Sequence, residues 1–287
     1  MQFQKFRSNN PKPSEPPPSD ACDCQIHVFG DPGRYPVRPD AAYTPFADAT
    51  IDAALAMHRS LGFSRGIIVQ ATTHGTDHRI LYDALECAGA NYKGVAVINE
   101  SVGDKELQRL HDAGVRGARF NFWKQLNLAP SWGEFRRSIH RIKDLGWLAK
   151  IHAAGDEWLE LEPLLTGLGV PVVVDHFGHL DISKGLDQPA VKLFRTMLRN
   201  EDWYIMISNA DRYSSMTSGW HDAAAFLKDL IALAPDRMIW SSDWPHVQYR
   251  KPMPTDTELL ELLYRTAPDP AVRRNVLCAT PQKLFRL

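Results

Sequence analysis

Short runs rich in β-branched and aromatic residues alternate with amphipathic stretches from about residue 20 to the end of the chain. This alternation is typical of βα units, which build a parallel sheet. Eight strands are expected, at residues 22–29, 66–71, 94–98, 115–120, 147–153, 170–177, 203–208 and 237–242. Because a doubly wound sheet normally has fewer strands and a glycine-rich nucleotide loop, the pattern favours an α/β fold closed as a (β/α)8 TIM barrel.

The length of 287 residues fits a single barrel domain, which we expect at residues 21–287. A proline-rich arm at residues 1–20 precedes it. The sequence leaves open whether this arm covers an end of the barrel, contacts a neighbouring subunit of a homo-oligomer, or is disordered. Among the helices, we expect one at 48–61, begun by Asp48, and one at 131–145, begun by Ser131 with Glu134 in a capping box.

The charge balance excludes several classes of partner. The chain has 33 basic and 34 acidic residues, so no overall field attracts nucleic acid or an anionic membrane. No segment approaches the roughly 20 apolar residues that a membrane span needs. Four scattered cysteines are typical of buried thiols in a reducing cytoplasm. We therefore expect a cytoplasmic protein that acts on a small molecule.

Polar side chains gather at the expected C-terminal ends of the strands. Asp243 directly follows the eighth expected strand, at 237–242, and is followed at once by Trp-Pro. In the first strand, a period of two places Gln25 and His27 inward and turns Cys22 and Cys24 toward the helices. The same parity sends further polar groups inward on the fourth, fifth and sixth strands, namely Arg119, His152 and His176.

Barrel interiors are mainly Val, Ile and Leu, so several charged or imidazole groups at one end indicate a functional site. Imidazoles and a carboxylate can bind a first-row metal. They can equally carry out acid–base chemistry, in which the carboxylate deprotonates a water and the imidazoles polarise a carbonyl. The residues alone leave both readings open. His179, three residues past His176, is expected to be a solvated loop histidine.

Five motifs in this order resemble the amidohydrolase superfamily, and within it the branch that includes 2-pyrone-4,6-dicarboxylate lactonase. They are DCQIHVFG at 23–30, IVQATTHGTD at 68–77, RGARFNF at 116–122, DHFG at 175–178 and IWSSDWPH at 239–246. The resemblance runs from about Asp23 to the C-terminus. It implies a barrel that opens a carboxylated lactone without a metal.

The resemblance also implies roles for individual residues. Asp243 is the base that activates water, and His27 and His176 lie close to the lactone carbonyl. Positions that hold substrate carboxylates are matched by Tyr43, Thr72, Arg119 and Arg212, and an arginine fork suits a carboxylate.

Three positions depart from the pattern of this branch. Gln25 stands in place of a histidine, Gln125 in place of an arginine, and His152 in place of a tyrosine. We therefore keep Gln25 and His152 among the expected substrate-binding residues and consider two alternatives. One is a metal-dependent hydrolase or decarboxylase with zinc or manganese at His27, His152 and Asp243. The other is a catalytically silent binding protein, in which loss of the first-strand histidine has removed activity.

Overall fold

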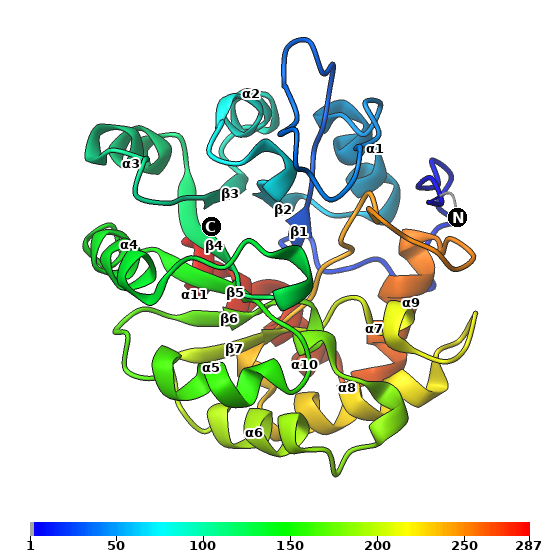
Figure 1. Cartoon of the computed structure of the whole chain (residues 1–287). Coiled ribbons are helices and arrows are strands. Elements are labelled where there is room, and N and C mark those ends of the chain that lie inside the picture. Colours follow the sequence, from blue (N-terminus) through cyan, green and yellow to red (C-terminus); the bar gives the residue numbers. More distant parts are fainter. Residues whose placement is uncertain (1–2) are drawn as a thin grey trace.

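The computed structural model describes residues 3–287, and within them eight parallel strands form one sheet whose order follows the chain. Helices lie outside the ring of strands (Figure 1). The expected α/β class and (β/α)8 barrel are therefore confirmed. The strands are β1 (Cys22–Ile26), β2 (Arg65–Val69), β3 (Tyr92–Val97), β4 (Val115–Asn121), β5 (Leu148–His152), β6 (Val172–Val174), β7 (Trp203–Met206) and β8 (Met238–Ile239).

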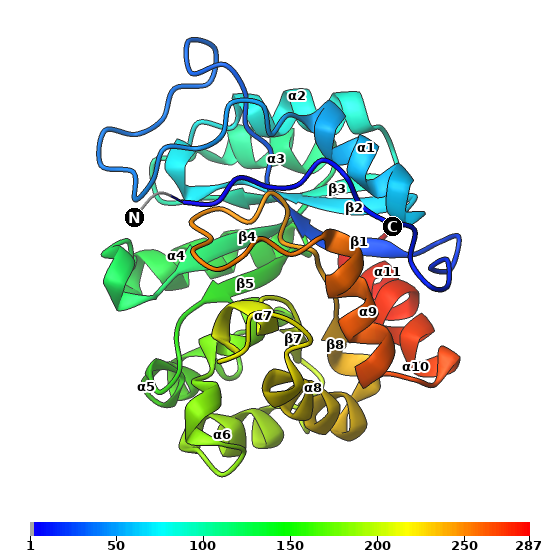
Figure 2. The same ribbon diagram turned by 90° about the vertical axis from the view of Figure 1, so that its right-hand side faces the viewer.

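The helices cover the barrel on all sides that Figures 1 and 2 show. In Figure 2, α1 to α3 lie on one side of the strands and α5, α6 and α8 on the opposite side. Their bounds are α1 (Ile51–Leu61), α2 (Arg79–Ala88), α3 (Asp104–Asp112), α4 (Trp132–Asp144), α5 (Glu157–Leu165), α6 (Pro189–Met197), α7 (Ala210–Tyr213), α8 (His221–Leu233), α9 (Asp256–Thr266), α10 (Pro270–Arg274) and α11 (Thr280–Phe285).

The ring closes between β1 and the segment that follows β8. The backbone N–H of Asp243 donates to the carbonyl of Gln25 at 3.2 Å, and that of His27 donates to the carbonyl of Trp244 at 2.8 Å. These bonds continue the parallel pairing past the end of β8. As a result, the backbone itself sets Gln25, His27 and Asp243 side by side at the C-terminal end of the barrel.

Below that end, the barrel interior is mostly apolar. Side chains from the strands meet two residues of α11 there, and Lys283 of α11 lies 5.7 Å from the ring of Tyr204, near the start of β7. The C-terminal helix therefore closes the barrel at the N-terminal ends of the strands. The cluster comprises Cys22, Cys24, Ile67, Val69, Val95, Leu148, Val173, Tyr204, Met206, Ile239, Leu284 and Phe285.

The expectation that Cys22 and Cys24 face the helices is wrong. The register between β1 and β2 shifts between Asp23 and Ile26, which marks an irregularity in the strand. Because of it, Cys24 and its chain neighbour Gln25 both lie inside the barrel, whereas Ile26 packs in the cluster that the helices share with the outer sheet face.

The helix caps explain where two of the predicted helices begin. Helix α4 begins after Ser131, and the reciprocal bonds of the Ser131–Glu134 capping box are both present, as expected. Helix α1 begins later than Asp48, because the side chain of Thr50 accepts the N–H of Ala53 and is the actual cap.

The proline-rich arm, described from residue 3 onward, contacts α9. Asn10 donates to Asp256 at 3.0 Å, and Ser14 donates through its hydroxyl to Glu261 at 2.9 Å. Of the arm expected at 1–20, residues 1 and 2 lie outside the described part of the chain. The domain boundary at residue 20 stays a prediction.

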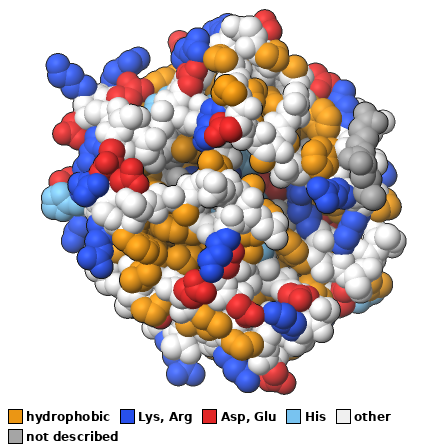
Figure 3. All heavy atoms as spheres, in the orientation of Figure 1, with side chains coloured by type: hydrophobic (Ala, Val, Ile, Leu, Met, Phe, Trp, Pro, Cys, Tyr) orange, Lys and Arg blue, Asp and Glu red, His pale blue; other side chains and the backbone are white. Residues whose placement is uncertain are grey.

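Lysine and arginine side chains are interspersed with aspartate and glutamate on the face of the molecule seen in Figure 3. This mixing agrees with the near-zero formal charge of the whole chain. Among the helices of the described residues, none is both long and apolar enough to cross a membrane.

Candidate active site

A cavity of about 460 Å³ lies at the C-terminal ends of the strands. Eight of the nine expected site residues line it, and the ninth, Gln25, lies at its floor in contact with three of the others. The structure therefore gathers the whole expected set in one place. The lining residues from that set are His27, Tyr43, Thr72, Arg119, His152, His176, Arg212 and Asp243.

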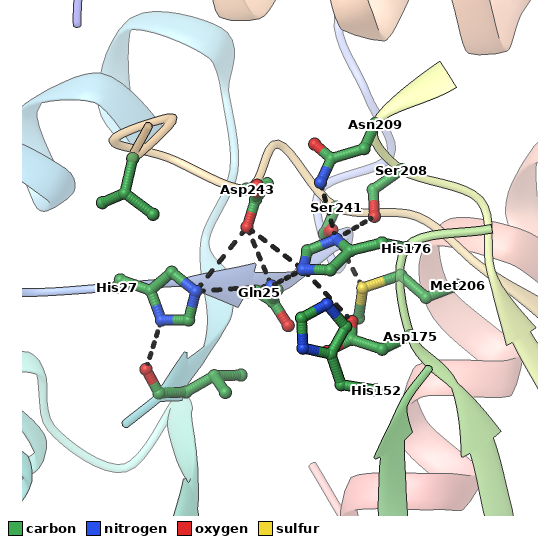
Figure 4. A network of polar contacts seen from close by, with 12 residues as sticks. Gln25, His27, His152, Asp175, His176, Met206, Ser208, Asn209, Ser241 and Asp243 are labelled. Atoms are coloured by element: carbon green, nitrogen blue, oxygen red, sulfur yellow. Dashed lines mark hydrogen bonds and ion pairs between the residues drawn. The ribbon is translucent and has the colours of Figure 1, made fainter. Parts of the chain in front are cut away.

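The side chains of Gln25, His27 and His176 all contact Asp243 (Figure 4). Its Oδ1 accepts a hydrogen bond from Gln25 Nε2 at 2.8 Å, and lies 3.6 Å from His27 Nε2 and 3.8 Å from His176 Nε2. Its Oδ2 lies 3.4 Å from Arg212 Nη2. The residue has a left-handed backbone, with φ of 61°.

The surroundings keep Asp243 ionised. Burial alone would raise the pKa of its carboxyl group. At the low pH where this group titrates, the charges of the protonated His176, of Arg212 and of the protonated His27, with the hydrogen bond from Gln25, outweigh burial and hold the pKa below its usual value. A carboxylate that is buried, charged and next to a cavity can accept a proton from a bound water.

His27 is held by its other ring nitrogen. Nδ1 lies 2.7 Å from the carbonyl oxygen of Val69, so in the neutral ring Nδ1–H donates there and Nε2 presents a lone pair. Burial lowers the pKa of His27 to about 4, with a further lowering by the charge of Arg119. The ring is therefore neutral near pH 7.

His176 comes from a turn rather than from a strand. Strand β6 was expected to reach residue 177 but ends at Val174, because His176 and Phe177 take left-handed conformations with φ of 48° and 56°. The turn carries the ring of His176 over the barrel mouth, where Nδ1 contacts Ser208 at 3.2 Å and Asn209 at 2.9 Å. His176 therefore lies at the expected site, but a turn and not the end of a strand positions it there.

The amide nitrogen of Gln25 occupies the centre of this group. It lies 2.8 Å from Asp243 Oδ1, 3.0 Å from His176 Nε2 and 3.4 Å from His27 Nε2 (Figure 4). An amide NH₂ has two hydrogens and no lone pair to give to a metal. Gln25 therefore places a hydrogen-bond donor at the point toward which Asp243, His176 and His27 would direct their lone pairs.

The residues present do not fit the metal alternative at His27, His152 and Asp243. Both ring nitrogens of His152 are engaged, by Asn121 and by His179. Within residues 3–287 there is no group of three or more His, Cys, Asp or Glu side chains placed to hold a metal ion.

A second wall of the cavity carries a chain of polar contacts that sequence reasoning missed. His152 Nδ1 contacts the side-chain oxygen of Asn121, His152 Nε2 lies 2.8 Å from His179 Nε2, and His179 Nδ1 lies 2.5 Å from Tyr213 Oη. The expectation that His179 is a solvated loop residue is therefore wrong: it is half-buried and lines the cavity.

These four side chains have a consistent set of hydrogen-bond donors and acceptors when the rings of His152 and His179 are both neutral. If Asn121 accepts from His152 Nδ1, then His152 Nε2 accepts from His179 Nε2, and His179 Nδ1 accepts from the hydroxyl of Tyr213. Burial, and the repulsion between charged forms of neighbouring rings, lowers the pKa of His152 and of His179 well below the usual value. The two rings of this wall are thus neutral, and their nitrogens are paired with one another and with Asn121 and Tyr213.

The cavity also contains fixed positive charge. Arg119 Nη2 pairs with Asp175 Oδ2 at 2.9 Å, and Arg212 Nη1 donates to the carbonyl of Val247 at 2.9 Å. Both guanidinium groups line the cavity and are anchored from behind. Such a site can bind an anionic group such as a carboxylate.

The sequence contains little information that would predict Asn121, His179 and Tyr213 as site residues. Asn121 lies two residues after Arg119 and so shares its strand face, which periodicity could have shown. Tyr213 directly follows Arg212 in the short helix α7, and no sequence pattern marks it. The position of His179 depends on the left-handed turn after β6.

Comparisons with known proteins agree with this geometry. The amidohydrolase family matches residues 22–287. Over 99% of its length, the chain is 35% identical to a 2-pyrone-4,6-dicarboxylate hydrolase of Comamonas testosteroni, of which 98% is covered. Over 93%, it is 34% identical to a 4-sulfomuconolactone hydrolase of Rhizobium radiobacter, of which 90% is covered.

A solved structure from Agrobacterium tumefaciens superimposes with a TM-score of 0.86 at 26% identity, covering 96% of this chain and 98% of that one. Since the family match extends over almost the whole described barrel, and since relatives more than 30% identical match over nearly their full lengths, the chain belongs to the amidohydrolase family.

Proposed function

We propose that this protein hydrolyses a small carboxylated lactone, with Asp243 as the base that activates water. The observation that carries the proposal is the ionised, buried carboxylate of Asp243 among Gln25, His27 and His176 at the floor of a cavity that also holds two arginines. The names of two relatives, both hydrolases of carboxylated or sulfonated lactones, support the substrate class.

In the proposed reaction, Asp243 takes a proton from water while the water oxygen attacks the lactone carbonyl carbon. Negative charge develops on the carbonyl oxygen, and in this proposal one amide hydrogen of Gln25 turns from its imidazole partner to stabilise it, while the other stays bonded to Asp243. The ring C–O bond then breaks, and the proton passes from Asp243 to the leaving oxygen. Because the pKa of Asp243 is low, its protonated form is a good acid for this last step.

The arginines hold the substrate in this scheme. Arg119 and Arg212 bind its carboxylate, and Tyr43 and Thr72, which line the same cavity, provide hydroxyl groups around it. His152 lines the opposite wall together with His179, and we propose that it contacts the uncharged part of the ring. Fixing the lactone in this way brings its carbonyl next to Asp243.

Replacing Asp243 tests the base directly. Asp243→Asn keeps the shape of the side chain but removes the proton acceptor, so kcat should fall at least about a hundredfold. The matched control is Asp144→Asn, which changes an exposed carboxylate at the end of α4 and should leave kcat unchanged. Turnover of carboxylated lactones is measured for both variants, together with their melting temperatures. Unchanged turnover in a folded Asp243→Asn protein would refute the assignment.

We also propose that the reaction needs no metal, because the amide of Gln25 fills the point where ligands would converge. Protein purified without chelator should therefore contain far less than one zinc or manganese per chain, and its turnover should not change on dialysis against a chelator. About one metal per chain that sustains activity would decide for the metal-dependent hydrolase or decarboxylase. If instead no lactone is turned over, but activity appears in Gln25→His, the silent binding protein is favoured.

A further inference from the structure

One charged side chain lies inside the apolar interior of the barrel, below the site. Lys150 of β5 is 1% exposed, and its Nζ is 2.9 Å from Asp175 Oδ1 and 3.2 Å from Met206 Sδ. A buried ammonium group strongly destabilises the folded state unless it is paired. The proposed mechanism gives Lys150 no task, so its burial calls for another explanation.

Lys150 belongs to a group of three charges. Asp175, which is 0% exposed, also pairs through Oδ2 with Arg119 Nη2 at 2.9 Å. Arg119 and Lys150 are register partners on β4 and β5, and Asp175 directly follows β6. We call Arg119, Lys150 and Asp175 the buried triad. Neither oxygen of Asp175 has a well-aligned hydrogen bond among the described residues, so the triad is held mainly by charge attraction.

If Asp175 were its only neighbour, Arg119 would attract an anion in the cavity only weakly. A carboxylate in contact with Arg119 cancels its charge as seen from the cavity, and a low-dielectric interior makes that cancellation effective. Two cations around one anion leave a net charge of +1. Burial would raise the pKa of Asp175, but the charges of His176, Lys150 and Arg119 hold it well below its usual value, so the carboxylate stays charged.

We propose that Lys150 is a positioning and specificity-determining residue: by neutralising Asp175 from below, it leaves the guanidinium of Arg119 free to attract an anionic group of the substrate. The inference deepens the proposed function and rests on it for the identity of the substrate. It concerns the binding of the anion, and can be measured without turnover. The substrate class that it selects is a lactone with an anionic group directed at Arg119.

The test compares variants that change the net charge of the triad. Lys150→Met gives 0 and the double variant returns to +1. Asp175→Asn gives +1 or +2, because burial lowers the pKa of Lys150 and the charge of Asp175, which opposes this, is removed. Methionine keeps the length of the lysine stem, and asparagine keeps the shape of the carboxylate. The matched control is Lys228→Met, which removes an exposed lysine on α8. Binding of citrate, as an anionic probe, is measured by calorimetry, and KM and kcat are measured for an anionic and for a neutral lactone.

We expect Lys150→Met to weaken citrate binding and to raise KM for the anionic lactone by about tenfold or more, since a unit charge in a partly buried site has an effect of this order. KM for the neutral lactone should not change. The double variant should recover most of the loss, and Asp175→Asn should bind citrate at least as tightly as the wild type. A purely structural role would instead make the double variant as poor as, or poorer than, either single variant.

Two results would overturn the inference: Lys150→Met that binds citrate like the wild type, or a folded double variant with no recovery. If Lys150→Met does not fold, Asp175→Asn decides, because weaker binding of citrate at a net charge no lower than that of the wild type contradicts the charge argument. If no lactone is turned over but citrate binding follows the charge order, the proposed function fails and the role of Lys150 stands.

Discussion

Asp243 is surrounded by groups that favour its charged form, and this sets the pH range in which it can act. A carboxyl group with a lowered pKa is ionised above that pKa and loses its function as the pH falls through it. The pKa of Asp243 lies below its usual value, and that of His27 is lowered to about 4. Near neutral pH, Asp243 is therefore charged and the imidazole of His27 is neutral.

The expected pH profile follows from the lowered pKa values of Asp243 and His27. From about pH 8 down to about pH 5, kcat/KM should stay nearly constant, because neither Asp243 nor His27 changes its protonation state there. The fall on the acid side should come at about pH 4 or lower, as Asp243 and His27 take up protons. Initial rates in overlapping buffers at constant ionic strength measure this. An acid limb centred near pH 6.5 would mean that a histidine with an ordinary pKa controls the reaction.

At the scale of single elements, the turn after β6 does the most to build the site. It places Asp175 in the triad, His176 over the barrel mouth and His179 in the second wall. Gly178 in this turn has φ of +63°, and a Cβ atom there would lie 2.3 Å from the ring of Phe194. The turn thus needs a residue without a side chain at this point.

Gly178→Ala tests how much depends on this turn. The substitution combines a left-handed backbone with a clash, so we expect it to lower the free energy of unfolding by about 2 kcal/mol or more and to reduce kcat. The control is Gly103→Ala at the start of α3, where φ is −71° and a Cβ would meet no atom within 4 Å. Urea unfolding and initial rates report both effects. Equal stability of the two variants would contradict the argument.

What the sequence could predict depended on regular periodicity. Arg119 and His152 lie where β4 and β5 pair in unbroken register, so counting by twos placed them correctly. The irregularity in β1 and the left-handed turn after β6 depend on tertiary packing and have no period. For this reason the side of Cys24, the end of β6 and the role of His179 could not be read from the chain alone.

At the scale of the whole molecule, the arm contacts the segment that follows Asp243. Phe6 packs edge-on against Trp244, with ring centroids 4.9 Å apart, and the N–H of Gln4 donates to the carbonyl of Tyr249 at 2.8 Å. The composition predicted an arm, but its position next to residues 244–249 could not be foreseen, because it depends on contacts between distant parts of the sequence.

Removing the ring of Phe6 should therefore affect the site from outside. Phe6→Ala is expected to lower the melting temperature by a few degrees and to raise KM for the lactone, since the segment carrying Asp243 loses a packing partner. Arg7→Ala changes an exposed neighbour in the arm and should do neither. Thermal melts and steady-state kinetics measure both quantities. If Phe6→Ala behaves like Arg7→Ala, the arm does not support the site.

The junction between β1 and the segment after β8 joins the two ends of the barrel sequence, and α11 supplies Leu284 and Phe285 to its interior. During synthesis, the first strand emerges from the ribosome long before its last partner exists. Its edge, and the apolar lining of a half-built ring, must then stay open until about residue 285 has been released. We therefore expect the nascent chain to need a chaperone until α11 has been released.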